Sequence, residues 1–208
     1  MLEWSNAGTA KQGEMMAKRR LPLALLLALT FAAAPAAAQK VPQSAIDAPS
    51  PLKPGDAFGE EATLPERTII YLQGHSRWDS ALDTLVEAFK TLNEYMDKHE
   101  LKAAGPAMTI YTKTDDTGFA FRAAVPIAEA PKDPPKGDLA IGQAPSGRAL
   151  KFIHRGSYDA MDSTYEAITN YLDDKGIDAK DSFIEEYTGG PLKAGDDNML
   201  VSVFVPVK

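Results

Sequence analysis

An internal repeat with an offset of about eighty residues is the feature that most constrains the fold. One copy begins at Arg67 and the other at Arg148. Self-similarity at a fixed spacing indicates two copies of one supersecondary unit. We therefore expect an α+β fold of two halves, each strand–helix–strand–strand, with one more strand ahead of each. The matching landmarks are Tyr71 with Phe152, Tyr111-Thr with Tyr187-Thr, and Val125-Pro-Ile with Val205-Pro-Val.

Apolar periodicity predicts one helix in each half. Apolar residues recur at helical spacing from Leu82 to Met96, with charged residues between them. A similar stripe runs from Met161 to Leu172, and Gly176 supplies a helix stop. Each half therefore has one amphipathic helix available to cover a sheet.

The last segment, residues 199–207, alternates like a strand. Its odd-numbered positions are Met199 and a row of valines, which we expect to pack under the helices. Leu200, Ser202 and Phe204 form the opposite row, left for solvent or a ligand. Carried across the repeat, the alternation puts Phe119, Phe121, Ala123, Ile184 and Met108 on the helix side. It puts Arg122, Ala124, Phe183, Glu185, Tyr187, Thr109 and Tyr111 on the open side.

This alternation predicts a row in which Glu185 lies between Phe183 and Tyr187. Aromatic side chains form flat, amphipathic walls, and a carboxylate among them is partly desolvated. Such a carboxylate favours a nearby cation or a proton. Two alternatives remain open: Arg122 pairs with Glu185 across the open face, or Glu186 is the inward residue and Glu185 is solvated.

The second half resembles the GyrI-like small-molecule-binding domain, which is also the effector-binding domain of multidrug-responsive transcription activators. The resemblance covers about residues 57–208 and is weaker in the first half. It implies an α+β fold in which two pseudo-symmetric βαββ repeats form one curved antiparallel sheet backed by two helices. It also implies an aromatic cleft where a buried glutamate, here Glu185, meets lipophilic cations. The motifs that carry it are His154-Arg-Gly-Ser-Tyr158, Tyr165, Tyr171-Leu172, Glu185-Glu-Tyr187 and Val205-Pro-Val207.

Together, the sheet pattern and the resemblance give a set of candidate ligand-binding residues. Trp78 and Tyr158 enter it because they begin the two helices, although simple packing explains them equally well. Tyr187 and Tyr111 are also compatible with ordinary strand positions. The full set is Glu185, Tyr187, Phe183, Tyr111, Tyr158, Trp78, Phe204 and Tyr71.

Three functions are compatible with this set. The first is a periplasmic domain that binds a hydrophobic, cationic or amphipathic small molecule. The second is a hydrolase of reactive compounds with Glu185 as general base, an activity that rests on the resemblance alone. The third is an envelope protein that regulates or docks a partner through its sheet.

The N-terminal region reads as an export signal. A basic stretch ends at Arg20, an apolar stretch runs from Leu21 to Phe31, and Ala36-x-Ala38 provides a cleavage site before Gln39. Residues 39–56 contain four prolines and are expected to form a linker. We place the binding domain at residues 57–208, with halves at about 57–129 and 138–208. An uncleaved anchoring helix is the alternative for the signal segment.

Composition excludes several other kinds of site. The chain has no cysteine and only three histidines, none in a metal-binding pair, so we expect no metal and no cofactor. His154 is expected to be a satisfied strand residue and His75 to lie in a polar turn. Residues 1–38 carry four basic and two acidic side chains, so their removal shifts the net charge from −7 to −9. This acidity disfavours nucleic acid and leaves monomer and dimer equally possible.

Overall fold

A computed structural model describes residues 55–208, so the predicted signal peptide and nearly all of the predicted linker lie outside the described residues. The helices are α1 (Ala81–Lys98) and α2 (Met161–Lys175), each preceded by a short 3-10 turn, Trp78–Ser80 or Tyr158–Ala160. The strands are β1 (Phe58–Leu64), β2 (Thr68–Arg77), β3 (Met108–Thr114), β4 (Gly118–Pro126), β5 (Leu139–Gln143), β6 (Gly147–Gly156), β7 (Phe183–Tyr187) and β8 (Met199–Pro206).

All eight strands form one antiparallel sheet with the order β1-β6-β8-β7-β3-β4-β2-β5. The strands β2, β3 and β4 of the first half meet β6, β7 and β8 of the second half where β3 pairs with β7. This confirms the predicted α+β fold of two βαββ repeats. The extra strand ahead of each half is also present, but each is exchanged: β1 pairs with β6, and β5 pairs with β2.

The exchanged strands force the sheet to curve. β1 and β2 lie six places apart in the sheet, about 29 Å if it were flat. Only residues 65–67 connect them, and a chain that short spans about 14 Å at most. Residues 144–146 make the same crossing from β5 to β6, and the Ala144 amide donates to the Arg67 carbonyl at 2.9 Å. The two ends of the sheet must therefore bend toward each other.

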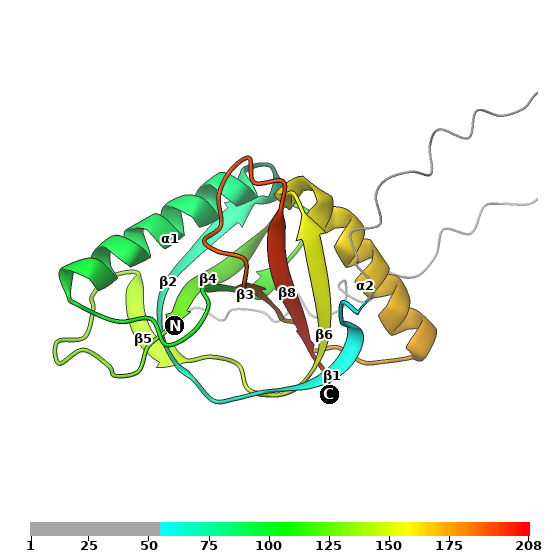
Figure 1. Cartoon of the computed structure of the whole chain (residues 1–208), viewed down its shortest axis with the longest axis horizontal. Helices are drawn as coiled ribbons and strands as arrows, with labels where there is room; N and C mark the ends of the chain where they lie inside the picture. Colours follow the sequence, from blue (N-terminus) through cyan, green and yellow to red (C-terminus); the bar gives the residue numbers. More distant parts are fainter. Residues whose placement is uncertain (1–54) are drawn as a thin grey trace, which may run out of the picture. The chain divides into compact units, whose positions relative to one another are not determined.

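Both helices cover the same face of the sheet, with α1 beside β2 and α2 beside β6 (Figure 1). The buried side chains of α1, among them Leu85, Phe89 and Leu92, belong to one apolar core together with Val201, Val203 and Val205 of β8. The predicted helix stop is confirmed, because Gly176 caps α2 in the left-handed conformation with φ 61°.

A second apolar cluster covers the opposite face of the sheet. Leu64 and Ala144, which flank the two crossing connections, pack there with Ile69, Met108 and Ile184. Arg67 lies in the first connection and forms an ion pair with Glu186 on the central strand β7. The connections thereby act as a strap that holds the curvature from the side without helices.

Strand register corrects one sequence-based expectation. β7 pairs with β8 so that Glu185 lies opposite Val203, and Ile184 lies opposite Phe204. Residues directly opposite in an antiparallel pair point to the same face. Glu185 therefore faces the helices, and the predicted helix-facing placement of Ile184 and Met108 is wrong. The predicted alternation in β3 and β7 was displaced by one residue, and such a displacement moves every side chain of a strand to the opposite face.

The same register corrects the other members of the row. Phe183, Tyr187, Thr109 and Tyr111 join Glu185 on the helix side, because β3 pairs with β7 in the same phase. In β4 the expectation was right: Phe119, Phe121 and Ala123 face the helices, while Ala124 packs on the opposite side. The alternation within each strand was therefore correct, and only its phase in β3 and β7 was wrong.

α2 is fastened to β6 by a buried polar contact. The Thr164 hydroxyl lies 2.7 Å from His154 Nδ1, and His154 Nε2 lies 3.1 Å from the Ser157 carbonyl oxygen. Since a carbonyl only accepts, Nε2 carries the proton and Thr164 donates to Nδ1. Burial lowers the pKa of His154 below its ordinary value of 6.5, so the imidazole is held neutral.

We predict that acidification weakens the fold through His154. Below about pH 6.5 the unfolded chain takes up a proton that the folded His154 refuses, so its contribution to stability is lost as pH falls. Chemical denaturation should show that the free energy of unfolding falls more steeply between pH 7.5 and 5.5 in the wild type than in His154→Gln. The difference is limited to about 1.4 kcal/mol per pH unit. Identical slopes in the two proteins would contradict this assignment.

Candidate functional site

The centre of the helix-covered face holds a buried carboxylate. Glu185 lies on the short strand β7, and its side chain points toward the helices with 1% of its surface exposed. β8 flanks it on one side and β3 on the other, so it lies close to the junction of the two halves. The open-face placement predicted for Glu185 is therefore replaced by a site between the sheet and the helices.

Three tyrosine hydroxyls donate hydrogen bonds to this carboxylate. Tyr165 of α2 donates to Oε1 at 2.7 Å. Tyr187 of β7 and Tyr111 of β3 donate to Oε2 at 2.9 Å and 3.1 Å. The donors come from one helix and two strands, so the bonds hold α2 and both central strands around Glu185.

Thr109 extends this network. It lies directly opposite Glu185 in the β3–β7 pair, and its Oγ1 lies 2.8 Å from the Tyr187 hydroxyl. Because Tyr187 gives its one proton to Glu185, Thr109 is the donor in this contact. Thr109 is also the repeat counterpart of Glu185, so one repeat supplies the acceptor and the other a hydroxyl that supports it.

Burial and hydrogen bonding act on the ionisation of Glu185 in opposite directions. Burial raises the pKa of Glu185 above its ordinary value of 4.5, while the three tyrosine bonds lower it. Burial and the adjacent carboxylate also raise the pKa values of Tyr111, Tyr165, Tyr187 and Tyr158, so these remain protonated donors. Among the described residues, no lysine or arginine forms an ion pair with Glu185. A bound cation would supply the missing countercharge.

Aromatic rings continue outward from the carboxylate. Phe119 lies 5.2 Å from the Tyr111 ring, and Trp78 lies 4.8 Å from Phe119, measured between ring centroids. Phe183 packs edge-on against Tyr165 at 5.7 Å. Trp78 is 46% exposed, so the Trp78–Phe119–Tyr111 series runs from the surface to the buried site.

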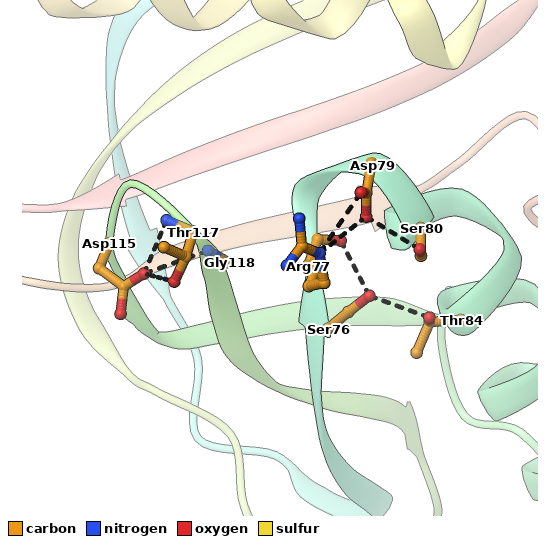
Figure 2. Close-up of polar contacts among 8 residues, drawn as sticks. All are labelled: Ser76, Arg77, Asp79, Ser80, Thr84, Asp115, Thr117 and Gly118. Atoms are coloured by element: carbon orange, nitrogen blue, oxygen red, sulfur yellow. Dashed lines mark hydrogen bonds and ion pairs between the residues drawn. The ribbon is translucent and has the colours of Figure 1, made fainter.

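Local polar contacts order the start of α1 and the β3–β4 turn (Figure 2). Asp115 Oδ1 accepts bonds from the Thr117 and Gly118 amides, which closes the β3–β4 turn. The Asp115 carbonyl oxygen then accepts the Trp78 indole N–H at 2.8 Å. On the facing side, Ser76 donates to Thr84 at 2.9 Å and ties the end of β2 to α1. The exposed indole is therefore held in place.

The structure brings six of the eight candidate residues to the helix-covered side: Glu185, Tyr187, Phe183, Tyr111, Tyr158 and Trp78. Phe204 and Tyr71 pack with the apolar cluster on the other face. Arg122 also lies on that face, over the Tyr71 ring, so the alternative in which Arg122 pairs with Glu185 is wrong.

Sequence reasoning missed two members of the site. Tyr165 was placed on the apolar stripe of the second helix and among the motifs of the resemblance, but it was not included in the candidate set. The available signal was its hydroxyl, which needs a partner when it is buried. Thr109 was expected on the open face beside Glu185, so nothing in the sequence indicated that its hydroxyl would be buried.

Metal clusters and membrane-spanning helices are absent from the described part of the chain. Residues 55–208 contain no cluster of three or more histidines and carboxylates suited to a metal ion. Neither α1 nor α2 has the length and apolar character needed to cross a membrane.

Comparison with known proteins assigns the family. The family model of the GyrI-like small-molecule-binding domain matches residues 60–208. A search of curated proteins gives no match.

Solved structures show the same fold. The crystal structure of the EcmrR C-terminal domain superposes with a TM-score of 0.61 at 17% identity, over 73% of this chain and 98% of that one. The cryo-EM structure of EcmrR in a DNA complex superposes with a TM-score of 0.61 at 18% sequence identity. That match covers 73% of this chain and 57% of the EcmrR chain. The structure of SAV2435 bound to tetraphenylphosphonium superposes with a TM-score of 0.50 at 13% sequence identity, and the match covers 73% of this chain and 94% of that one. At these sequence identities the likeness concerns the fold alone. The family assignment rests on the family model, which matches residues 60–208. The chain belongs to the GyrI-like small-molecule-binding domain family.

Proposed function

We propose that this domain binds hydrophobic cations, with Glu185 as the charge-selecting group. The observation that carries the proposal is a buried carboxylate without a cationic partner among the described residues, surrounded by aromatic rings. Ring faces stabilise a cation by about 0.5–2 kcal/mol per contact. The three hydroxyl donors stabilise the anionic form of the carboxylate and so offset part of the effect of burial. A neighbour of the same fold, SAV2435, has been solved with the lipophilic cation tetraphenylphosphonium, which supports this ligand class.

Access to Glu185 requires side-chain movement, because the carboxylate is almost fully covered. Tyr158, Tyr165 and Phe183 are only partly buried, in contrast to Tyr111 and Tyr187. We infer that these outer rings swing aside and then pack against the ligand. Displacement of Tyr165 from Oε1 would free one carboxylate oxygen to face the bound charge.

We further propose that the domain acts after export, in the periplasm or outside the cell. The basic, apolar and small-residue segments before Gln39 support export. The acidic charge of the exported chain supports the absence of nucleic acid among its partners.

The first prediction concerns charge selection. Glu185→Gln keeps the side-chain shape and removes the charge, so affinity for tetraphenylphosphonium should fall at least tenfold, about 1.4 kcal/mol. Isothermal titration calorimetry measures this. Glu94→Gln is the matched control, because it removes the same charge from an exposed position of α1. Unchanged affinity in folded Glu185→Gln, or an equal loss in Glu94→Gln, would reject Glu185 as the charge-selecting group.

The second prediction concerns pH. Since the pKa of Glu185 is raised, the folded protein keeps a proton that the unfolded chain releases above about pH 4.5. The contribution of Glu185 to stability is therefore complete below pH 4.5 and is lost as pH rises through the raised pKa. The stability of the wild type relative to Glu185→Gln should decrease from pH 4 to 7, and cation affinity should increase over the same range. A pH-independent stability difference would show that Glu185 titrates normally.

The third prediction concerns export. If the signal segment is cleaved after Ala38, mass spectrometry of protein from the periplasmic fraction should show a chain beginning at Gln39. Full-length chain retained in the membrane fraction would instead support an uncleaved anchor.

A further inference from the structure

A second hollow lies on the face of the sheet without helices, opposite to the face that holds Glu185. Its volume is about 320 Å³, and its lining includes Gln73, His75, Thr112, Ala120, Arg122 and Asp138. Gln73 and His75 pair directly with Arg122 and Ala120, which places all four side chains on that face. Since Arg122 and Glu185 lie on opposite faces, this hollow is independent of the proposed cation site.

The strand pattern explains why the sheet is hollowed here. β5 pairs with β2 only over Thr68–Leu72, and one more backbone bond joins the Gln73 amide to the Asp138 carbonyl at 3.1 Å, so β2 becomes a bare edge beyond Gln73. The β3–β4 register shifts between Tyr111 and Lys113, which displaces Thr112 from the regular ladder. Ala120 contributes only a methyl group to the floor. The hollow is therefore a product of the backbone and does not depend on one side-chain rotamer.

Arg122 differs from every other arginine in residues 55–208. Each of the other four has a carboxylate partner: Arg67 with Glu186, Arg77 with Asp79, Arg148 with Glu61, and Arg155 with Asp56. Arg122 forms no ion pair and donates no hydrogen bond within this part of the chain. In a protein with 29 acidic and 22 basic residues, an unpaired and partly buried guanidinium is unexpected.

The guanidinium is also held in a fixed position. Its central carbon lies 4.7 Å from the centroid of the Tyr71 ring, in a cation–π contact. Stacking orients the planar group and leaves its N–H fork free to bind a carboxylate through two parallel bonds. Little conformational entropy then remains to be lost when a ligand binds.

We propose that this hollow is a second binding site, specific for a small monocarboxylate held by Arg122. The volume is at the lower end of the range for small-molecule sites, which suits a ligand of the size of benzoate. One guanidinium matches one carboxylate, and Asp138 in the lining disfavours a doubly charged anion such as phosphate. The domain would then bind opposite charges on opposite faces of its sheet.

Equilibrium dialysis of labelled benzoate against the full chain tests this site. The wild type should bind benzoate, and Arg122→Gln should weaken binding at least tenfold. Arg122→Lys, which keeps the charge and loses the fork, should also bind more weakly than the wild type. Arg148→Gln is the matched control, since it removes the same charge from strand β6 and should leave benzoate affinity unchanged.

Two further measurements make the result decisive. Thermal melts establish that each variant is folded, and tetraphenylphosphonium titration of Arg122→Gln should match the wild type, which separates this site from that of Glu185. Benzoate binding that survives Arg122→Gln, equal losses in Arg122→Gln and Arg148→Gln, or no binding by the wild type at about 10 mM would overturn the site. Inorganic phosphate binding as tightly as benzoate would overturn the carboxylate specificity.

Discussion

The antiparallel pairing of β3 with β7 determines both the fold and the site. It joins strands β2, β3 and β4 of the first half to strands β6, β7 and β8 of the second, and its register puts Thr109, Tyr111, Phe183 and Glu185 on one face of the sheet. With Thr109 opposite Glu185, the carboxylate points into the core, where it must obtain hydrogen bonds from protein side chains. Three tyrosines and the supporting threonine meet that requirement, and they do so from both halves of the repeat.

The repeat is symmetric in its backbone and asymmetric in its chemistry. Trp78 and Tyr158 occupy equivalent positions before the two helices, yet Trp78 is exposed while Tyr158 is close enough to Glu185 for the carboxylate to raise its pKa. Glu185 itself has an uncharged counterpart in Thr109. A site close to the junction of two similar halves thus contains a single carboxyl group, which is compatible with the proposed recognition of a single cationic group.

Much of this organisation could be predicted from the sequence. The repeat indicated two similar halves, periodicity located both helices, and the grouping of Glu185 with Phe183, Tyr187 and Tyr111 proved correct in space. The face on which this group lies was not predictable, because it depends on the register of β7 against β8 across the loop between them. Strand alternation fixes which residues share a face, and only cross-strand pairing fixes which face it is. The contribution of Tyr165 depends on how α2 docks, which local periodicity does not specify.

The exchange of β1 and β5 between the halves has a consequence for folding. Neither repeat can complete its own sheet, because the strand that borders it is supplied by the other repeat. The sequence separation between β1 and its partner β6 is large, and such non-local pairings slow folding. An isolated half would expose two unpaired edges, a state prone to strand swapping between molecules. The two repeats therefore form one cooperative unit, despite an appearance of two duplicated modules.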